Sequence, residues 1–228
     1  MTRRIALAAG LALALAGCAS DGTPSPALAV ARLAQAEVLS RRAAPGGEAA
    51  PAITRAQLAQ YDTPMIMAEI PSAGLTAFVV PFARNGAVET WSTIDDRTIA
   101  FRGGIMVATR GFGPDILQSD APEIARIASG TGTFRRSYYF TDGADQTRRF
   151  EYLCTLADRG MTTVTVVERQ HTVRHVTESC SGNGVDFVND YWFEGGGFLR
   201  KSRQLLTPEW GHVVLSRVVD NARNIGLP

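Results

Sequence analysis

The chain has 228 residues, of which 45% are apolar, 8% aromatic and 20% charged. This is the composition of a globular domain with one sizeable core, and it excludes a disordered tail. The formal net charge is +1, from 23 basic and 22 acidic residues, so no long-range field would attract nucleic acid or an anionic membrane surface.

The N-terminal segment has the pattern of a bacterial lipoprotein signal. Arg3 and Arg4 precede an uninterrupted run of apolar residues and glycine over 5–16. As a helix, this run would span about 18 Å, which is too short for a bilayer core of about 30 Å, so it is interpreted as a signal segment and not as a membrane anchor. Leu15-Ala16-Gly17-Cys18 follows and resembles a lipobox, in which the cysteine sulfur takes a diacylglycerol before cleavage. Ala19 instead of aspartate after the cysteine favours transfer to the outer membrane.

Cleavage before Cys18 would remove Arg3 and Arg4 and change the formal charge from +1 to −1. We therefore expect residues 1–17 to be a lipoprotein signal peptide, 18–52 to be the lipidated Cys18 and a flexible tether, and 53–228 to be a single β-rich domain. The tether is rich in Ala, Pro and Gly and has no aromatic residue. An ordinary secretory signal that happens to contain a cysteine is the alternative, but no better cleavage site follows. In the lipoprotein interpretation, localisation on the periplasmic face of the outer membrane would depend on the lipid on Cys18.

The first part of the domain is predicted to begin with a short helix and to continue in strands. Thr54 is placed to cap a helix over 55–61, which Pro64 would end. Apolar runs separated by glycine-, proline- and aspartate-containing turns predict the strands 65–70, 75–81, 88–94, 98–102 and 105–110.

An interruption follows, and then strands resume. Residues 115–117 are predicted as a single helical turn and 122–128 as a second short helix. Strict alternation over 150–156 is the pattern of a half-buried strand, and Asp158-Arg-Gly160 is predicted as the turn after it. The predicted strands of this half are 134–141, 150–156, 161–167, 173–178, 185–193, 198–206 and 213–219.

These elements predict a mainly β fold: an antiparallel meander that forms an incomplete barrel or a sandwich, with one or two short helices. A domain of about 175 residues buries roughly 70% of its unfolded surface, so it needs neither a metal nor a cofactor to fold, and no cofactor is predicted.

Three cysteines occur, and the lipobox accounts for Cys18. In an oxidising periplasm Cys154 and Cys180 are predicted to form a structural disulfide, with two buried thiols as the alternative. Closing a loop of about 27 residues would stabilise the fold by about 3.5 kcal/mol. A redox site is not expected because the sequence has no C-x-x-C.

No catalytic or metal-binding residues are predicted. His171 and His175, with Glu168 nearby, would suit zinc on a helix, but the Val and Thr residues around them favour a strand. On a strand, positions i and i+4 stand about 13 Å apart, so exposed imidazoles are expected instead. Asp95-Asp96 is typical of a turn, and there is no G-x-S-x-G. No helix start follows the glycines at 103–104 and 195–197, which leaves phosphate binding unsupported.

The remaining functional hint is aromatic. Trp91, Trp192 and Trp210, together with Tyr191 and Arg203, are candidates for a glycan or partner surface, because indole faces stack on sugar rings. The alternative is that the tryptophans belong to the core. Trp210 is expected to be the most exposed, since 208–211 is predicted as a turn.

Several motifs together resemble the YjbF/GfcB-like lipoproteins, which are accessory factors of group 4 capsule and related exopolysaccharide production. The C-terminal motifs are Asn189-Asp-Tyr-Trp192, Gly197-Phe-Leu-Arg-Lys-Ser-Arg-Gln204 and Pro208-Glu-Trp-Gly211. Upstream motifs are Trp91 before a turn, Gly104-Ile-Met-Val-Ala-Thr109-Arg-Gly111, Asp115-Ile-Leu117, and the trio Cys154, Glu178 and Cys180. The resemblance covers about 53–219 plus the lipobox. It departs from the family at Leu205-Leu206, where an aromatic is expected, and in its longer tether.

The resemblance implies a mostly antiparallel β-structure and a non-enzymatic role. It also implies work beside an outer-membrane β-barrel protein and periplasmic exopolysaccharide factors. Polysaccharide itself is a further candidate partner, and nucleic acid is not. Two alternatives differ in class: a lipid or lipoprotein carrier with an apolar cavity in a half-open barrel, and a periplasmic glycan hydrolase or lyase, which needs two carboxylates about 5 to 10 Å apart.

Overall fold

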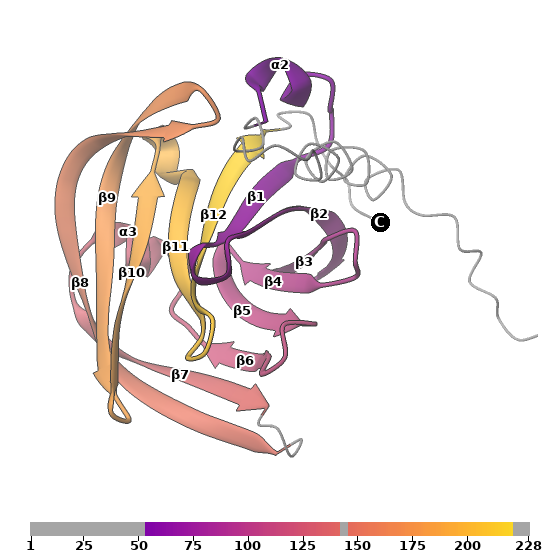
Figure 1. Cartoon of the computed structure of the whole chain (residues 1–228). Coiled ribbons are helices and arrows are strands. Elements are labelled where there is room, and N and C mark those ends of the chain that lie inside the picture. The colour runs from indigo at the N-terminus through magenta and orange to yellow at the C-terminus, as the bar shows by residue number, and fades with distance from the viewer. Residues whose placement is uncertain (1–52, 142–145, 221–228) are drawn as a thin grey trace, which may run out of the picture.

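The computed structural model describes residues 53–141 and 146–220, which form a twelve-stranded antiparallel sheet curled into a nearly closed barrel (Figure 1). The strand order is β5-β4-β3-β2-β1-β12-β11-β10-β9-β8-β7-β6. Each strand pairs with its neighbour in the chain except β5 and β6, which are the two edges of the sheet, and β1 also pairs with β12, so the sheet is a meander whose first and last strands are joined. The predicted mainly β fold with short helices is confirmed.

The elements of the first half are α2 (Arg55–Leu58), β1 (Met65–Ile70), the 3₁₀ turn η1 (Pro71–Ala73), β2 (Leu75–Asn85), β3 (Val88–Ser92), β4 (Thr98–Arg102), β5 (Ile105–Arg110), β6 (Ile116–Asp120) and α3 (Ile124–Ser129). Those of the second half are β7 (Thr133–Thr141), β8 (Thr147–Val166), β9 (Arg169–Gly182), β10 (Val185–Phe193), the 3₁₀ turn η2 (Gly195–Gly197), β11 (Leu199–Thr207) and β12 (Gly211–Val219).

The main core fills the inside of the barrel. Side chains alternate between the inside and the outside along a strand, so a strand that lines the core buries one phase. In β10, for example, Phe187, Asn189, Tyr191 and Phe193 are buried, and the residues between them are more exposed. Aromatic rings from several strands meet there, and many make edge-to-face contacts, such as Tyr152 with Phe187 at 4.9 Å between centroids.

A smaller core lies beneath α2. Leu58 packs with Met65, Phe78, Val80, Val166 and Val218. A capping box begins the helix, because the Thr54 side chain accepts from Gln57 N and the Gln57 side chain accepts from Thr54 N. Arg55 then donates to the carbonyls of Val166, Val167 and Val218, so the helix ties the tip of the β8–β9 hairpin to the end of β12.

Two local predictions were wrong. Residues 115–117 are not a helical turn, because Ile116 starts β6 and pairs with Phe140 of β7. Asp158-Arg-Gly160 does not end a strand, because β8 runs on through it as a bulge, with the Asp158 side chain accepting from Gly160 N at 2.8 Å. The turn comes instead at Val167 and Glu168, both of which have positive φ.

The predicted signal peptide, Cys18 and the tether lie outside the described residues, as do residues 142–145 and 221–228. Among the residues that the structure describes, no helix has the length and apolar character needed to cross a membrane.

Candidate functional site

An ion pair lies inside the barrel. Arg136 of β7 and Glu178 of β9 are both fully buried, and Arg136 Nη1 lies 2.9 and 2.8 Å from the two carboxylate oxygens. Tyr191 Oη and Asn189 Nδ2 each donate to Glu178 Oε2 at 2.8 Å. The carboxylate is therefore compensated by one cation and two neutral donors, which a buried charge requires.

The titration of these groups follows from their placement. Burial by itself would lower the pKa of Arg136, but the adjacent Glu178 carboxylate outweighs burial and holds that pKa well above its ordinary value. Burial, reinforced by Glu178, raises the pKa of Tyr191 well above its ordinary value. The tyrosine thus stays protonated and remains a donor, so the cluster is a fixed structural network.

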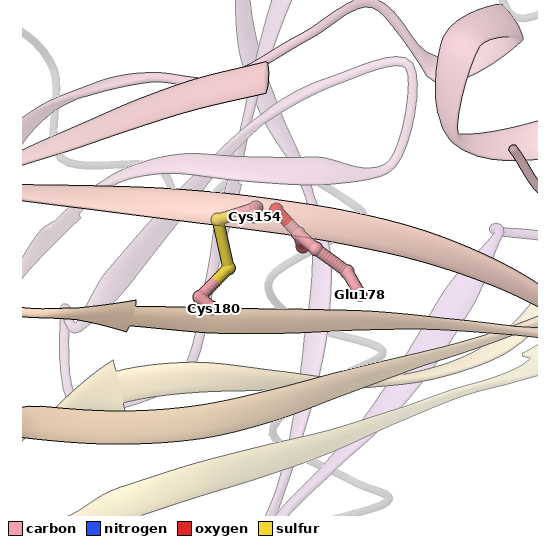
Figure 2. A group of neighbouring side chains, drawn as sticks. All are labelled: Cys154, Glu178 and Cys180. Atoms are coloured by element: carbon pink, nitrogen blue, oxygen red, sulfur yellow. A yellow bond between two sulfur atoms is a disulfide. The ribbon is translucent and has the colours of Figure 1, made fainter. Parts of the chain in front are cut away.

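The predicted disulfide is present. Cys154 of β8 and Cys180 of β9 are directly opposed in the sheet and joined, with Glu178 beside them (Figure 2). Ligand atoms of these three residues lie within 4.8 Å of one another. Both sulfurs are consumed by the disulfide, so the trio offers no thiolate pair to a metal.

A side-chain seam connects the two edges of the barrel, β5 and β6. Thr109 Oγ1 donates to Asp115 Oδ1 at 2.9 Å and accepts from Ile116 N at 3.0 Å. The Asp115 carboxylate also accepts from the backbone amides of Gly111 and Phe112. The G-x-x-x-x-T-x-G and following Asp-Ile motifs are therefore the residues that bring the free edges of the barrel together.

The C-terminal motifs also help to hold the edges of the barrel together. Gln204 of β11 accepts from Met106 N and donates to Gly104 O, both at 2.9 Å, so it holds β5 across the interior. Trp210 is half-buried and its indole Nε1 donates to Phe112 O at 2.7 Å, which anchors the β5–β6 connection. These motif residues build the barrel and do not converge on a reaction centre.

One end of the interior carries an alternating stack of rings and cations. The guanidinium of Arg217 on β12 lies 4.8 Å from the Trp91 ring centroid and 5.7 Å from that of Phe198. Arg200 of β11 lies 4.8 Å from Phe198. Trp91 is only 2% exposed and Tyr191 is fully buried, so for both residues the core alternative holds and the candidate surface does not. Four residues of these clusters were not predicted as site residues: Arg136, Phe198, Arg200 and Arg217.

Trp192 and Arg203 lie on the outer side of the sheet. Trp192 stacks on His175 at 4.9 Å between centroids, and Lys201 lies 5.8 Å from its ring. His175 and Lys201 are its cross-strand partners on the two flanking strands. Arg203 pairs with Asp190, which also binds His175 Nε2 at 2.8 Å. The structure therefore joins Trp192 and Arg203 through Asp190, but it brings neither Trp91 nor Trp210 to them. Contact with a glycan at this outer patch stays a prediction.

The histidines lie on a strand, as expected, but His171 is not an exposed imidazole. It is 5% exposed, and its Nδ1 pairs with Glu194. Burial would raise the pKa of Glu194, but hydrogen bonds from Arg200 and His171 lower it overall. His171 was misplaced because β9 begins earlier than predicted and Glu194 lies on the loop after β10.

Two carboxylates converge on Arg200: Glu194 Oε2 and Asp220 Oδ2 lie 2.6 and 2.7 Å from its Nη2. A glycosidase pair needs one carboxyl that holds a proton, which requires a raised pKa. The pKa of Glu194 is lowered instead. Both carboxylates therefore compensate the charge of the Arg200 guanidinium.

Two cavities open into the barrel. One of about 220 Å³ is lined by both arginines of the stack, Phe198, Phe101 and the glycines 103, 104 and 197. The other, of about 210 Å³, is mainly apolar and includes Ile70, Val79, Ile99 and Phe112. Both are smaller than the roughly 300–1,000 Å³ of pockets that enclose drug-sized ligands, and neither has room for paired acyl chains.

Comparison with known proteins agrees with this architecture. The family model described as group 4 capsule polysaccharide lipoprotein GfcB, YjbF matches residues 27–218. The crystal structure of the hypothetical lipoprotein YmcC from Escherichia coli (K12) has a similar fold, with a TM-score of 0.65 at 15% identity over 74% of this chain and 89% of that one. No curated protein matches the sequence. The family match spans most of the chain, and the chain belongs to the YjbF family of group 4 capsule polysaccharide lipoproteins.

Proposed function

We propose that this protein is a non-enzymatic accessory factor of capsule or exopolysaccharide secretion, anchored by a lipid on Cys18 at the periplasmic face of the outer membrane. The observation that carries the proposal is the family match over residues 27–218. The placement of the motif residues supports it, because Thr109, Asp115, Glu178 and Gln204 hold the barrel together and leave its surfaces for binding.

The anchor follows from the lipobox sequence. Once the signal is removed, the formal charge of −1 gives no attraction to an anionic surface, so Cys18 alone would set the location. We further propose that the partners are an outer-membrane β-barrel protein and periplasmic secretion factors, with polysaccharide as a further ligand.

The carrier alternative is less well supported. Its interior would have to be an open apolar cavity, but Phe, Tyr and Trp rings fill this barrel, and the two cavities described above measure about 220 and 210 Å³. The hydrolase alternative needs one carboxyl that holds a proton, but the pKa of Glu194 is lowered where it binds Arg200.

Deletion of the gene followed by complementation tests the proposal. Deletion should abolish or sharply reduce secreted polysaccharide, and the wild-type chain should restore it. Cys18→Ser should leave a folded protein that no longer fractionates with outer membranes and restores little secretion. Ala19→Asp is the matched variant, since it keeps the lipid but should retain the protein in the inner membrane.

Crosslinking and pull-down of the lipidated protein from membranes tests the partner. Recovery of an outer-membrane β-barrel protein by wild type but not by Cys18→Ser is expected. Unchanged secretion and unchanged assembly of that barrel in the deletion strain would overturn the proposed function.

A further inference from the structure

The 220 Å³ cavity holds a cation that the rest of the protein leaves without an anion. Arg217 lies in the same phase of β12 as the buried Val213 and Leu215, and its side chain lines the cavity. Within residues 53–141 and 146–220, its guanidinium has no salt bridge and donates no hydrogen bond; its contacts are the rings of Trp91 and Phe198. Five N–H donors therefore remain available in a partly desolvated site.

The neighbouring charges are already engaged. Asp220 pairs with Arg200 at 2.7 Å, and Glu89 pairs with Arg84. Burial, with a contribution from Arg200, lowers the pKa of Arg217 despite these two carboxylates. A ligand anion would supply the compensation that the described residues do not.

The size and the lining of the cavity restrict which ligands can bind in it. Its size suits a single ring and not a chain of them. Phe198 is 39% exposed, so part of its ring is accessible at the opening beside the guanidinium. Gly103 and Gly104 line the wall where a Cβ would press on Ile124 and Leu199, so the β4–β5 turn and α3 enclose the site tightly.

We propose that this cavity binds the carboxylate of an acidic sugar unit, with Arg217 as the anion-binding residue and Phe198 as the surface against which the ring packs. Guanidinium binds carboxylate through paired N–H donors, and an aromatic ring suits the apolar face of a sugar. The need for an anion comes from the geometry; the choice of a sugar rests on the proposed function.

The test measures the binding of glucuronate to the purified full chain by NMR titration. Glucose and inorganic phosphate are the comparison probes. Wild type should bind glucuronate at least about tenfold more tightly than glucose and more tightly than phosphate. Arg217→Met should weaken glucuronate binding at least about tenfold, as expected for loss of a charged hydrogen-bonded pair. Arg217→Lys should retain part of the affinity, because it keeps the charge and loses the planar fork.

Arg135→Met is the matched control, since Arg135 is an exposed arginine on β7 outside the cavity, and it should bind as wild type. Thermal unfolding of each variant separates lost binding from lost folding. Equal binding of glucose and glucuronate, preference for phosphate, or full binding by Arg217→Met would overturn the inference. Failure to bind glucuronate would do so too, while leaving the secretion phenotype, and with it the proposed function, intact.

Discussion

Arg136 and Arg217 both lie on the inner side of the barrel, yet the fold surrounds them differently. Arg136 faces Glu178, and Asn189 and Tyr191 complete the hydrogen bonds of that carboxylate. Arg217 faces two aromatic rings and a cavity. Arg136 has a built-in anion and is part of the structure, whereas the proposed ligand would supply the anion that Arg217 does not have.

The largest expected effect comes from breaking the paired region. Glu178→Gln should destabilise the protein by about 3–5 kcal/mol, because it leaves Arg136 buried without a counter-charge. Urea unfolding measures this. The matched control is Glu151→Gln, which removes an exposed glutamate paired with Arg149 and should cost at most about 1 kcal/mol. Similar losses in the two variants would contradict the structural role of the interior pair.

Loss of the disulfide beside this pair is expected to cause the second-largest loss of stability. Reduction, or the double substitution Cys154→Ala and Cys180→Ala, should lower the free energy of unfolding by about 2–5 kcal/mol. Reductant should have no further effect on the double variant. If the unfolding midpoint of the wild-type protein were the same with and without reductant, the β8–β9 wall would not need its crosslink.

The seam between β5 and β6 should contribute less to stability than the ion pair or the disulfide. Asp115→Ala removes the acceptor of the Gly111 and Phe112 amides and should cost about 1–3 kcal/mol. Hydrogen exchange of those two amides should accelerate. Asp115→Asn keeps one acceptor oxygen and should lie between Asp115→Ala and wild type, and unchanged exchange in both variants would show that the backbone, not Asp115, holds the seam.

The smallest effect on stability should come from the unpaired arginine. Arg217→Met keeps the bulk against Trp91 and Phe198 and removes a charge with no ion pair, so mainly its cation–π contacts are lost and the free energy of unfolding should fall by about 1 kcal/mol or less. The same unfolding assay as for Glu178→Gln gives the comparison directly. A loss as large as that of Glu178→Gln would erase the distinction between the two arginines.

Much of the fold was predictable because its signals are local. The strands Met65–Ile70, Thr98–Arg102, Ile105–Arg110 and Val185–Phe193 were predicted with the bounds they have, since apolar residues flanked by turn residues define them. The errors occurred where a tertiary contact overrides local preference. Asp115 is typical of a helix start, but here its carboxylate caps a turn, and β7 takes the following residues as a strand partner.

The candidate site was less accessible to sequence analysis. A signal for Arg136 was present, because it lies in the apolar phase Phe134, Arg136, Tyr138 and Phe140, where a charge implies a buried partner. Nothing local identifies that partner as Glu178, which is 42 residues away in the chain. Arg217, Phe198 and Trp91 likewise meet only because β1 and β12 join the two ends of the meander.

The sequence by itself determined the strand pattern, the pairing of two cysteines and the family, because alternation, spacing and motif order are properties of neighbouring residues. The tertiary structure decided whether the meander closed, which side each tryptophan faces, and which arginine received an anion. Those outcomes depend on how the sheet curls and on contacts between residues far apart in the chain, and no local pattern encodes them.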